Sequence, residues 1–220
     1  MLPMITREQW GAKPPKSPLT PWSASPRGIV VHYSGMAADY QADHANCASR
    51  FRIIQNYHQN HPTENYVDIA YSVGSCVHGF LYELRGWGFK SGANGTADAN
   101  NKYVAMLLLG NDSANRTDFT DAMKRTTKAV VAEAKQRWSS ATEVHPHSFI
   151  KATSCPGNEI RSWLSAGTPL PAPPAPPAPP LYVVNDANGK FVTQTEDIEV
   201  WKQEAGEILL QQGKVGGYRK

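Results

Sequence analysis

Cysteine is scarce in this chain of 220 residues, which contains only Cys47, Cys76 and Cys155. An odd and low number of cysteines argues against a framework of disulfide bonds. We therefore expect Cys47 and Cys76 to be buried thiols that pack as small hydrophobic side chains. The fold must then rely on a hydrophobic core, for which a hydrophobic content of 40% is ordinary.

Long hydrophobic runs and a strong net charge are also missing. The longest apolar run, Val104 to Leu109, is far shorter than the roughly 20 residues that span a membrane. Residues 1–7 lack the basic head and apolar core of a secretory signal, so we expect synthesis in a cytoplasm. A net charge of +3 is compatible with an anionic polymer as partner but is too small to indicate nucleic-acid binding.

Proline, in contrast, is concentrated in one segment. Residues 169–180 contain almost only proline and alanine, a composition that favours an extended polyproline II rod. A spacer is the expected role, and a ligand for an aromatic groove is the alternative. The sequence thus predicts a domain at 1–168, a linker at 169–180, and a small C-terminal module at 181–220. No motif decides whether this module binds the cell wall, pairs with a copy of itself or docks on the first domain.

Hydrophobic periodicity predicts an α/β domain, in which strands alternate with long helices. Strands are expected at 28–33, 69–74 and 104–109, and the glycine-rich segment 92–101 is expected to be a mobile loop. One helix is expected at 43–60, with Cys47, Phe51, Ile54 and Tyr57 on its apolar face. A second is expected at 119–138, with Phe119, Met123, Val130, Ala134 and Trp138 on one face.

The C-terminal module has its own pattern. Two apolar stretches within 181–192 flank a segment that ends in Asn-Gly, which predicts a β-hairpin. Residues 198–212 have helical periodicity. A module of this size has a marginal core by itself.

Three residues have the chemistry of a catalytic zinc site. His32 ends an apolar run, and His147 and Cys155 are separated by a gap that suits a connecting loop. Two imidazoles and one thiolate fill three positions of a zinc tetrahedron and leave the fourth for water. His145 is a rival ligand to His147.

Two other interpretations of these residues remain open. Cys155 could be a nucleophile activated by His147, as in a thiol hydrolase. A structural zinc ion would instead need a fourth protein ligand. The candidates for that ligand are His44, His58, His61 and His78.

An ordered set of segments resembles the zinc-dependent N-acetylmuramoyl-L-alanine amidases, the family shared by phage lysins and peptidoglycan recognition proteins. The segments are Thr6–Ala12, which ends in Trp-Gly-Ala, Val31–Ser34, Phe51–His58, Asp68–Gly74, Glu83–Trp87, Ala105–Asn111 and His147–Gly157. They follow one another in the family's order, and the resemblance as a whole extends over roughly residues 5–165.

The resemblance implies a mixed central β-sheet flanked by helices and a Zn²⁺ ion held by His32, His147 and Cys155. The family's spacing from its second histidine to its cysteine favours His147 over His145. Tyr71 corresponds to the family's catalytic tyrosine, which would hold the zinc-bound water, although a core aromatic on a strand is the alternative role.

Two further site residues are suggested at the sequence level. Thr153 occupies a position where several phage amidases have lysine and many recognition proteins have threonine, so its hydroxyl is expected to donate to the oxyanion without supplying a charge. Lys151 is a possible source of that charge. Trp87, beside glycines, is expected either to line the substrate groove or to pack in the core.

The function implied by the resemblance is hydrolysis of the amide between N-acetylmuramic acid and L-alanine in bacterial peptidoglycan, by a zinc-activated water, as a phage-type lysin. The enzyme would be made in the host cytoplasm without a signal peptide and act at the cell wall after release. The alternatives are a non-catalytic peptidoglycan-recognition protein and a virion-associated, wall-piercing component.

Overall fold

The computed structural model describes residues 3–36, 43–64, 66–113 and 116–168, and three strands between 182 and 219. The chain forms two compact units, Met1–Pro171 and Ala172–Lys220. The predicted linker at 169–180 lies outside the described residues. Within the described part of the chain, no helix combines the length and hydrophobicity that a membrane span requires.

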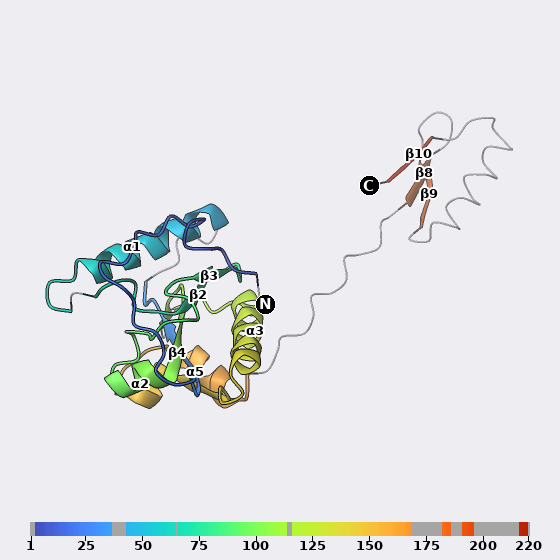
Figure 1. Cartoon of the computed structure of the whole chain (residues 1–220). Helices are drawn as coiled ribbons and strands as arrows, with labels where there is room; N and C mark the ends of the chain where they lie inside the picture. The colour runs from blue at the N-terminus through green and yellow to red at the C-terminus, as the bar shows by residue number, and fades with distance from the viewer. Residues whose placement is uncertain are drawn as a thin grey trace. The chain divides into compact units, whose positions relative to one another are not determined.

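The first unit is built on a five-stranded sheet with the order β3-β2-β4-β1-β7 (Figure 1). β1 pairs in parallel with both β4 and β7, β2 pairs in parallel with β4, and β3 is the antiparallel edge strand. The strands are β1 (Gly28–Tyr33), β2 (Val73–Ser75), β3 (Leu81–Glu83), β4 (Tyr103–Leu108) and β7 (Glu143–Pro146).

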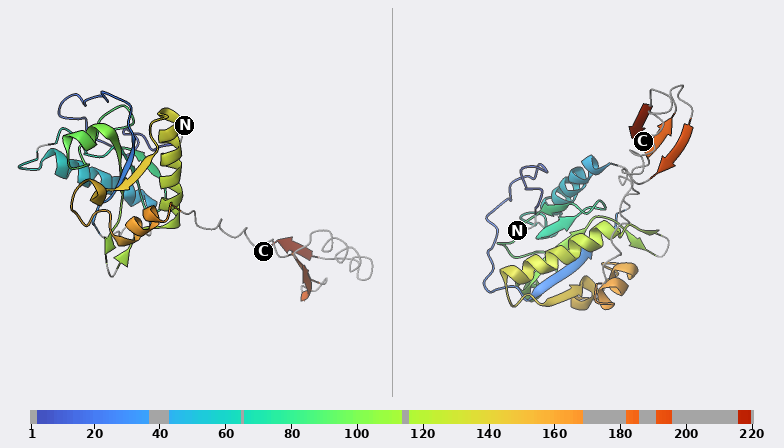
Figure 2. Two further views of the ribbon diagram at one scale, coloured as in Figure 1. Left: turned by 90° about the horizontal axis from the view of Figure 1, so that it is seen from below. Right: turned by 90° about the vertical axis from the view of Figure 1, so that its right-hand side faces the viewer.

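Two long helices flank this sheet. α1 (Cys47–Gln59) and α3 (Asp121–Arg137) lie on different sides of β2 and β3 in Figure 1, and α3 crosses in front of the strands in the right-hand view of Figure 2. Every residue of β4 and all but the last residue of β1 are buried, as expected for parallel strands covered on both faces. The predicted class, a mixed central sheet flanked by helices, is confirmed.

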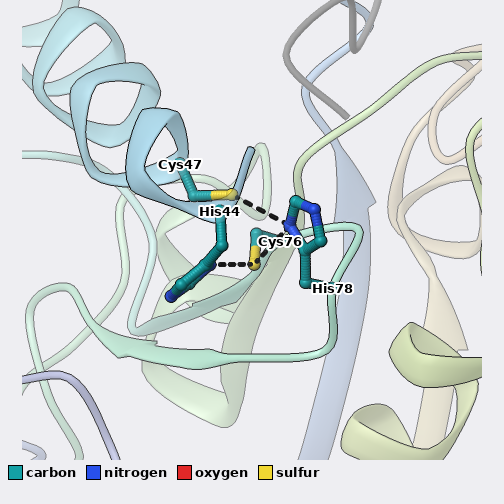
Figure 3. Close-up of side chains that lie close together, drawn as sticks. All are labelled: His44, Cys47, Cys76 and His78. Carbon is teal, nitrogen blue, oxygen red and sulfur yellow. Dashed lines mark hydrogen bonds between the residues drawn. The ribbon is translucent and has the colours of Figure 1, made fainter. Parts of the chain in front are cut away.

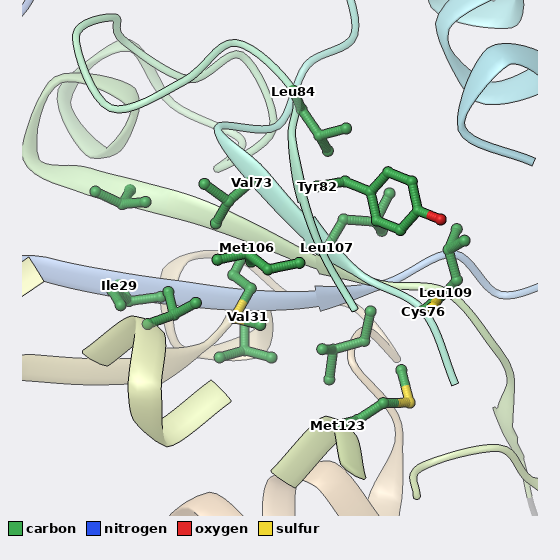
Figure 4. Packing of buried hydrophobic residues seen from close by; sticks show 14 of the residues in the cluster. Ile29, Val31, Val73, Cys76, Tyr82, Leu84, Met106, Leu107, Leu109 and Met123 are labelled. Atoms are coloured by element: carbon green, nitrogen blue, oxygen red, sulfur yellow. The ribbon is translucent and has the colours of Figure 1, made fainter. Parts of the chain in front are cut away.

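The core lies between the sheet and these helices (Figure 4). Ile29 and Val31 of β1, Met106 of β4 and Met123 of α3 are at most 1% exposed. The helix predicted at 119–138 is α3, which is slightly shorter, and Met123, Val130 and Ala134 of its predicted core face are buried. Phe119, just before the helix, is also buried, and Trp138, at its C-cap, is partly buried against the same core. Thr120 caps the helix, since its Oγ1 accepts a hydrogen bond from the Met123 N–H.

The apolar face of α1 is narrower than predicted. A short 3₁₀ turn, η1 (His44–Asn46), precedes the helix, and Asp43 caps this turn. Cys47 and Phe51 are fully buried, but Tyr57 is 61% exposed. The helical periodicity therefore gave the correct element but the wrong environment for Tyr57, because this side of the helix lines a cavity and is not covered by the core.

The strand predicted at 69–74 is displaced toward its C-terminal end. Only Val73–Ser75 forms β2, although Ile69 and Ala70 are buried. The segment before β2 is irregular and is held by backbone hydrogen bonds, including one from the Arg85 N–H to the Tyr71 carbonyl. A short run of apolar residues predicts that the segment is buried, but a buried segment need not be a β-strand.

The predicted mobile loop at 92–101 is wrong in its second half, which contains the helix α2 (Ala97–Lys102). Thr96 caps this helix by accepting a hydrogen bond from the Ala99 N–H. The first half is also fixed, because Asn94 is fully buried and hydrogen-bonded. The glycine content of the segment masked this local capping signal.

The remaining elements of the first unit are short. They are β5 (Asp112–Ser113), β6 (Arg116–Thr117), α4 (His147–Ile150) and α5 (Asn158–Ser165). The second unit contains a three-stranded antiparallel sheet with the order β10-β8-β9. Its strands are β8 (Tyr182–Asn185), β9 (Phe191–Thr195) and β10 (Gly216–Arg219). The predicted hairpin is confirmed as β8 and β9, and the helix predicted at 198–212 lies outside the described residues.

Candidate metal centre

The structure brings the three predicted ligands together. Their ligand atoms lie within 4.8 Å of one another. The Cys155 Sγ is 3.8 Å from the His32 Nδ1, and the ring centroids of His32 and His147 are 4.4 Å apart. His32 is buried, and His147 and Cys155 are partly exposed.

Sheet order explains why these residues meet. β1 and β7 are parallel neighbours, so their carboxyl ends lie at the same edge of the sheet. His32 stands near the end of β1, and His147 directly follows β7. The loop with Cys155 returns to this edge, where the Ser148 N–H donates to the Cys155 carbonyl and the Tyr33 N–H donates to its Sγ.

Asn94 determines which nitrogen of His32 can bind a cation. The Asn94 side-chain amide donates to the carbonyls of Ala99 and Tyr103, at 3.1 and 2.9 Å. Its Oδ1 must therefore accept from the His32 Nε2, which is 2.9 Å away. This hydrogen bond places the proton of His32 on Nε2 and leaves the lone pair of Nδ1 directed to the side of Cys155.

The electrostatics of the three residues suit a cation. Burial, with a smaller effect of His147, lowers the pKa of His32 to about 3, so its imidazole is neutral. Burial also lowers the pKa of His147, and its Nε2 is buried without a hydrogen-bond partner. Burial raises the pKa of Cys155 to about 11, so a thiolate there requires a nearby positive charge. The donor set and the orphaned nitrogen fit a zinc ion.

The same pKa shifts argue against the thiol-hydrolase interpretation. A nucleophilic cysteine is activated by a lowered thiol pKa, whereas the pKa of Cys155 is raised. The imidazole nitrogen 3.8 Å from the Cys155 sulfur belongs to His32. Because burial lowers the pKa of His32, this imidazole is too weak a base to take the proton of the Cys155 thiol.

The other histidines lie in different environments. His145 contacts the Glu143 carboxylate at 3.1 Å and stacks on Phe149, so it is separate from the three ligands. His58 accepts a hydrogen bond from the Ala70 N–H, and His61 accepts from backbone groups of its own turn. Neither therefore completes the tetrahedron around His32. His44 and His78 belong to a second cluster with Cys47 and Cys76.

Tyr71 lies beside the three ligands. Its ring packs edge-on against His32, with the centroids 5.2 Å apart. Burial, followed by the charge of Cys155, raises the pKa of Tyr71. The phenol is therefore protonated near neutral pH and can donate a hydrogen bond.

Thr153 and Lys151 approach the site from the loop between α4 and α5. The Thr153 Oγ1 accepts a hydrogen bond from the Cys155 N–H at 3.2 Å, which leaves the hydroxyl proton free to donate elsewhere. Lys151 lowers the pKa of His147 through its charge. A Cβ atom built on Gly95 would lie 2.9 Å from the Lys151 side chain and 3.3 Å from the His147 Nε2, and the φ of +87° at this position also favours glycine.

Two cavities adjoin the metal centre. One, of about 340 Å³, is mainly apolar and lies between α1 and the site, where Ile53, Tyr57 and Tyr71 line it. The other, of about 510 Å³, is mainly polar and is lined by Glu64, His147, Lys151 and residues of the 92–100 segment. A ligand extended across the metal centre would thus meet an apolar wall on one side and a polar wall on the other.

Trp87 lines neither of these two cavities. It is 8% exposed, packs against Trp138 and lies under the Arg137 guanidinium. Its carbonyl accepts a hydrogen bond from the Trp22 indole. This environment favours the packing role among the two that the sequence allowed.

Residues 22–158 match the family Amidase_2, described as N-acetylmuramoyl-L-alanine amidase. An N-acetylmuramoyl-L-alanine amidase of Sus scrofa is 28% identical over 164 residues, which cover 71% of this chain and 26% of that protein. The chain thus spans about a quarter of that relative. Peptidoglycan-recognition protein LB of Drosophila melanogaster is 30% identical over 167 residues, which cover 73% of this chain and 68% of that protein.

The fold has counterparts among solved structures. One is peptidoglycan recognition protein-LE in complex with tracheal cytotoxin, a monomeric diaminopimelic acid-type peptidoglycan. It aligns with a TM-score of 0.65 at 18% identity, over 74% of this chain and 92% of that one. The family match extends over more than half of the residues of this chain, which therefore belongs to the N-acetylmuramoyl-L-alanine amidase family Amidase_2.

Proposed function

We propose that this protein is a zinc-dependent N-acetylmuramoyl-L-alanine amidase that cleaves bacterial peptidoglycan. The observation that carries this proposal is the convergence of His32, His147 and Cys155 beside the protonated phenol of Tyr71. Membership of the Amidase_2 family supports the same substrate class.

Each residue has a defined part in this mechanism. His32 and His147 provide neutral nitrogens and Cys155 provides a thiolate, which together would hold the zinc ion. The ion would lower the pKa of a water molecule and polarise the scissile carbonyl. The Tyr71 hydroxyl orients the attacking oxygen, and the Thr153 hydroxyl donates to the oxyanion. The Lys151 ammonium adds positive charge on the side of His147.

The cavities on both sides of the site suit a branched ligand with sugar and peptide parts. Ile53 and Tyr57 line the apolar cavity and are 50% and 61% exposed, so both side chains are available to contact a substrate. The polar cavity with Lys151 can receive carboxylate or amide groups. The amide to be cleaved would lie between them, next to Tyr71.

Digestion of purified peptidoglycan, followed by mass spectrometry, tests this activity. Release of free stem peptides that begin with L-alanine is expected, and a chelator should abolish it. The Cys155→Ser variant should lose activity together with the zinc of this site, whereas His145→Ala should keep both. Full activity of Cys155→Ser would refute the mechanism.

Peptidoglycan recognition without catalysis is the second candidate, because a relative of known structure holds a peptidoglycan fragment on the same fold. A recognition protein would bind purified sacculi in the presence of chelator and release no peptide. A single digestion experiment therefore distinguishes the amidase from the recognition protein.

We further propose that the enzyme acts as a phage-type lysin, made in the host cytoplasm and active at the wall after release. Lysis of host cells whose membrane has been permeabilised, and its absence in cells with an intact membrane, is the expected result. Detection of the protein in purified virions would instead favour a wall-piercing component.

A further inference from the structure

A second group of metal-binding side chains lies outside the amidase site (Figure 3). It consists of His44, Cys47, Cys76 and His78, which share no residue with the first site. The sequence alone suggested that the two cysteines were packing residues. Both are fully buried, but their sulfur atoms face imidazole nitrogens rather than only apolar neighbours.

The four ligand atoms are arranged at nearly the spacing of a tetrahedron. The Cys47 Sγ is 3.4 Å from the His78 Nδ1, and the Cys76 Sγ is 3.7 Å from the His44 Nδ1 and 3.9 Å from the His78 Nδ1. All four atoms lie within 4.8 Å of one another. Bonds of about 2.0–2.1 Å to nitrogen and 2.3 Å to sulfur imply ligand separations of about 3.3–3.8 Å around zinc.

Local structure explains the convergence. His44 and Cys47 are three residues apart, at the junction of η1 and α1, and therefore share one face of the chain. Cys76 and His78 alternate along the turn that links β2 to β3, which is closed by a hydrogen bond from the Gly79 N–H to the Cys76 carbonyl. Phe80 stacks on the His44 ring with a centroid distance of 3.8 Å and fixes its orientation.

We propose that His44, Cys47, Cys76 and His78 form a structural zinc site that fastens the start of α1 to the β2–β3 turn. Soft thiolates combined with imidazoles in a tetrahedral arrangement select zinc among the common divalent ions. Four protein ligands leave no open position, so this ion would have no catalytic role. Such a site would crosslink the start of α1 to the β2–β3 turn, as a disulfide bond does in other proteins.

Metal counting tests the proposal. Elemental analysis of the purified full-length protein should find two zinc ions per chain. Cys155→Ser should retain one ion, at the second site. His78→Asn should also retain one ion, at the amidase site. The control His61→Ala, which changes a histidine outside both clusters, should retain two. One ion in the wild type together with none in Cys155→Ser would overturn the proposal.

X-ray absorption at the zinc edge identifies the ligands. The ion retained by Cys155→Ser should show two sulfur and two nitrogen neighbours, because only the second site is then filled. Removal of that ion should lower the thermal midpoint, and added zinc should restore it. Mass spectrometry that finds a Cys47–Cys76 disulfide in the zinc-loaded protein would also overturn the proposal, since a disulfide leaves no thiolate for the metal. If the amidase site holds no zinc, the wild type and Cys155→Ser should each retain one ion, so failure of that site is distinguishable from failure of this proposal.

Discussion

At the scale of single residues, the candidate metal site formed by His32, His147 and Cys155 depends on a side chain that is not one of its ligands. Asn94 is fully buried and accepts the only proton of the His32 imidazole. It thereby orients the ring and fixes the nitrogen that faces Cys155. Hydrogen-bond partners of this kind orient the ligand, and their loss typically weakens metal binding by about 10- to 100-fold.

We predict that Asn94→Ala weakens zinc binding at the amidase site by about 10- to 100-fold. The His32 Nε2–H would lose its acceptor, and the ring would lose its fixed orientation. The zinc concentration that restores half of the activity to chelator-treated protein measures the effect. Asn56→Ala, which changes an asparagine on the surface of α1, is the control. Equal half-restoring concentrations would show that Asn94 has only a packing role.

Tyr71 provides a second prediction at this scale. Tyr71→Phe should retain zinc but lower kcat by about 100-fold or more, because only the donor hydroxyl is removed. Initial rates of stem-peptide release, measured beside the zinc content, check this outcome. Tyr57→Phe removes a hydroxyl from the same cavity and should leave kcat nearly unchanged. Normal turnover in Tyr71→Phe would assign Tyr71 to packing alone.

At the scale of elements, the close pairing of β1 with β7 sets the distance between His32 and His147. Gly28 opposes Glu143 in this pairing. A Cβ atom at Gly28 would lie only 1.9 Å from the Glu143 carbonyl oxygen. Any larger residue therefore forces the two strands apart, and the helix α4 that carries His147 moves with β7.

We predict that Gly28→Ala lowers the free energy of unfolding by about 1–3 kcal/mol or more, because the clash involves backbone that cannot rotate away. Zinc affinity at the amidase site should fall as well. Urea denaturation and zinc titration measure the two effects. Gly88→Ala is a matched control, since a Cβ there meets nothing within 4 Å. Similar effects of both substitutions would mean that the strand spacing is not critical.

At the scale of the whole molecule, all proposed chemistry lies in the first compact unit, Met1–Pro171. We predict that residues 1–168 alone fold and cleave soluble muropeptides. Deletion of 181–220 should reduce lysis of intact walls more than hydrolysis of small fragments, because a wall-binding module raises the local enzyme concentration. Parallel assays on sacculi and on soluble muropeptides provide the measurement.

Other outcomes of the truncation would change the role of the C-terminal unit. Equal losses on both substrates would mean that residues 181–220 support the amidase fold. No loss on either substrate would mean that they neither anchor the enzyme to the wall nor stabilise it.

The sequence by itself determined the features that depend on local order along the chain. The apolar runs of β1 and β4, the core face of α3 and the C-terminal hairpin follow from periodicity and turn residues, which act over a few residues. The candidate ligands His32, His147 and Cys155 were found because their residue types and order match those of related amidases.

Only the tertiary structure decided which distant residues meet. The role of Asn94, the exposure of Tyr57 and the cluster of Cys47 and Cys76 with two histidines depend on which segments, distant in the sequence, lie side by side. Packing against elements far away in the chain decides whether a helix face is covered and whether a buried cysteine meets an aliphatic side chain or an imidazole. Local sequence patterns do not encode those contacts.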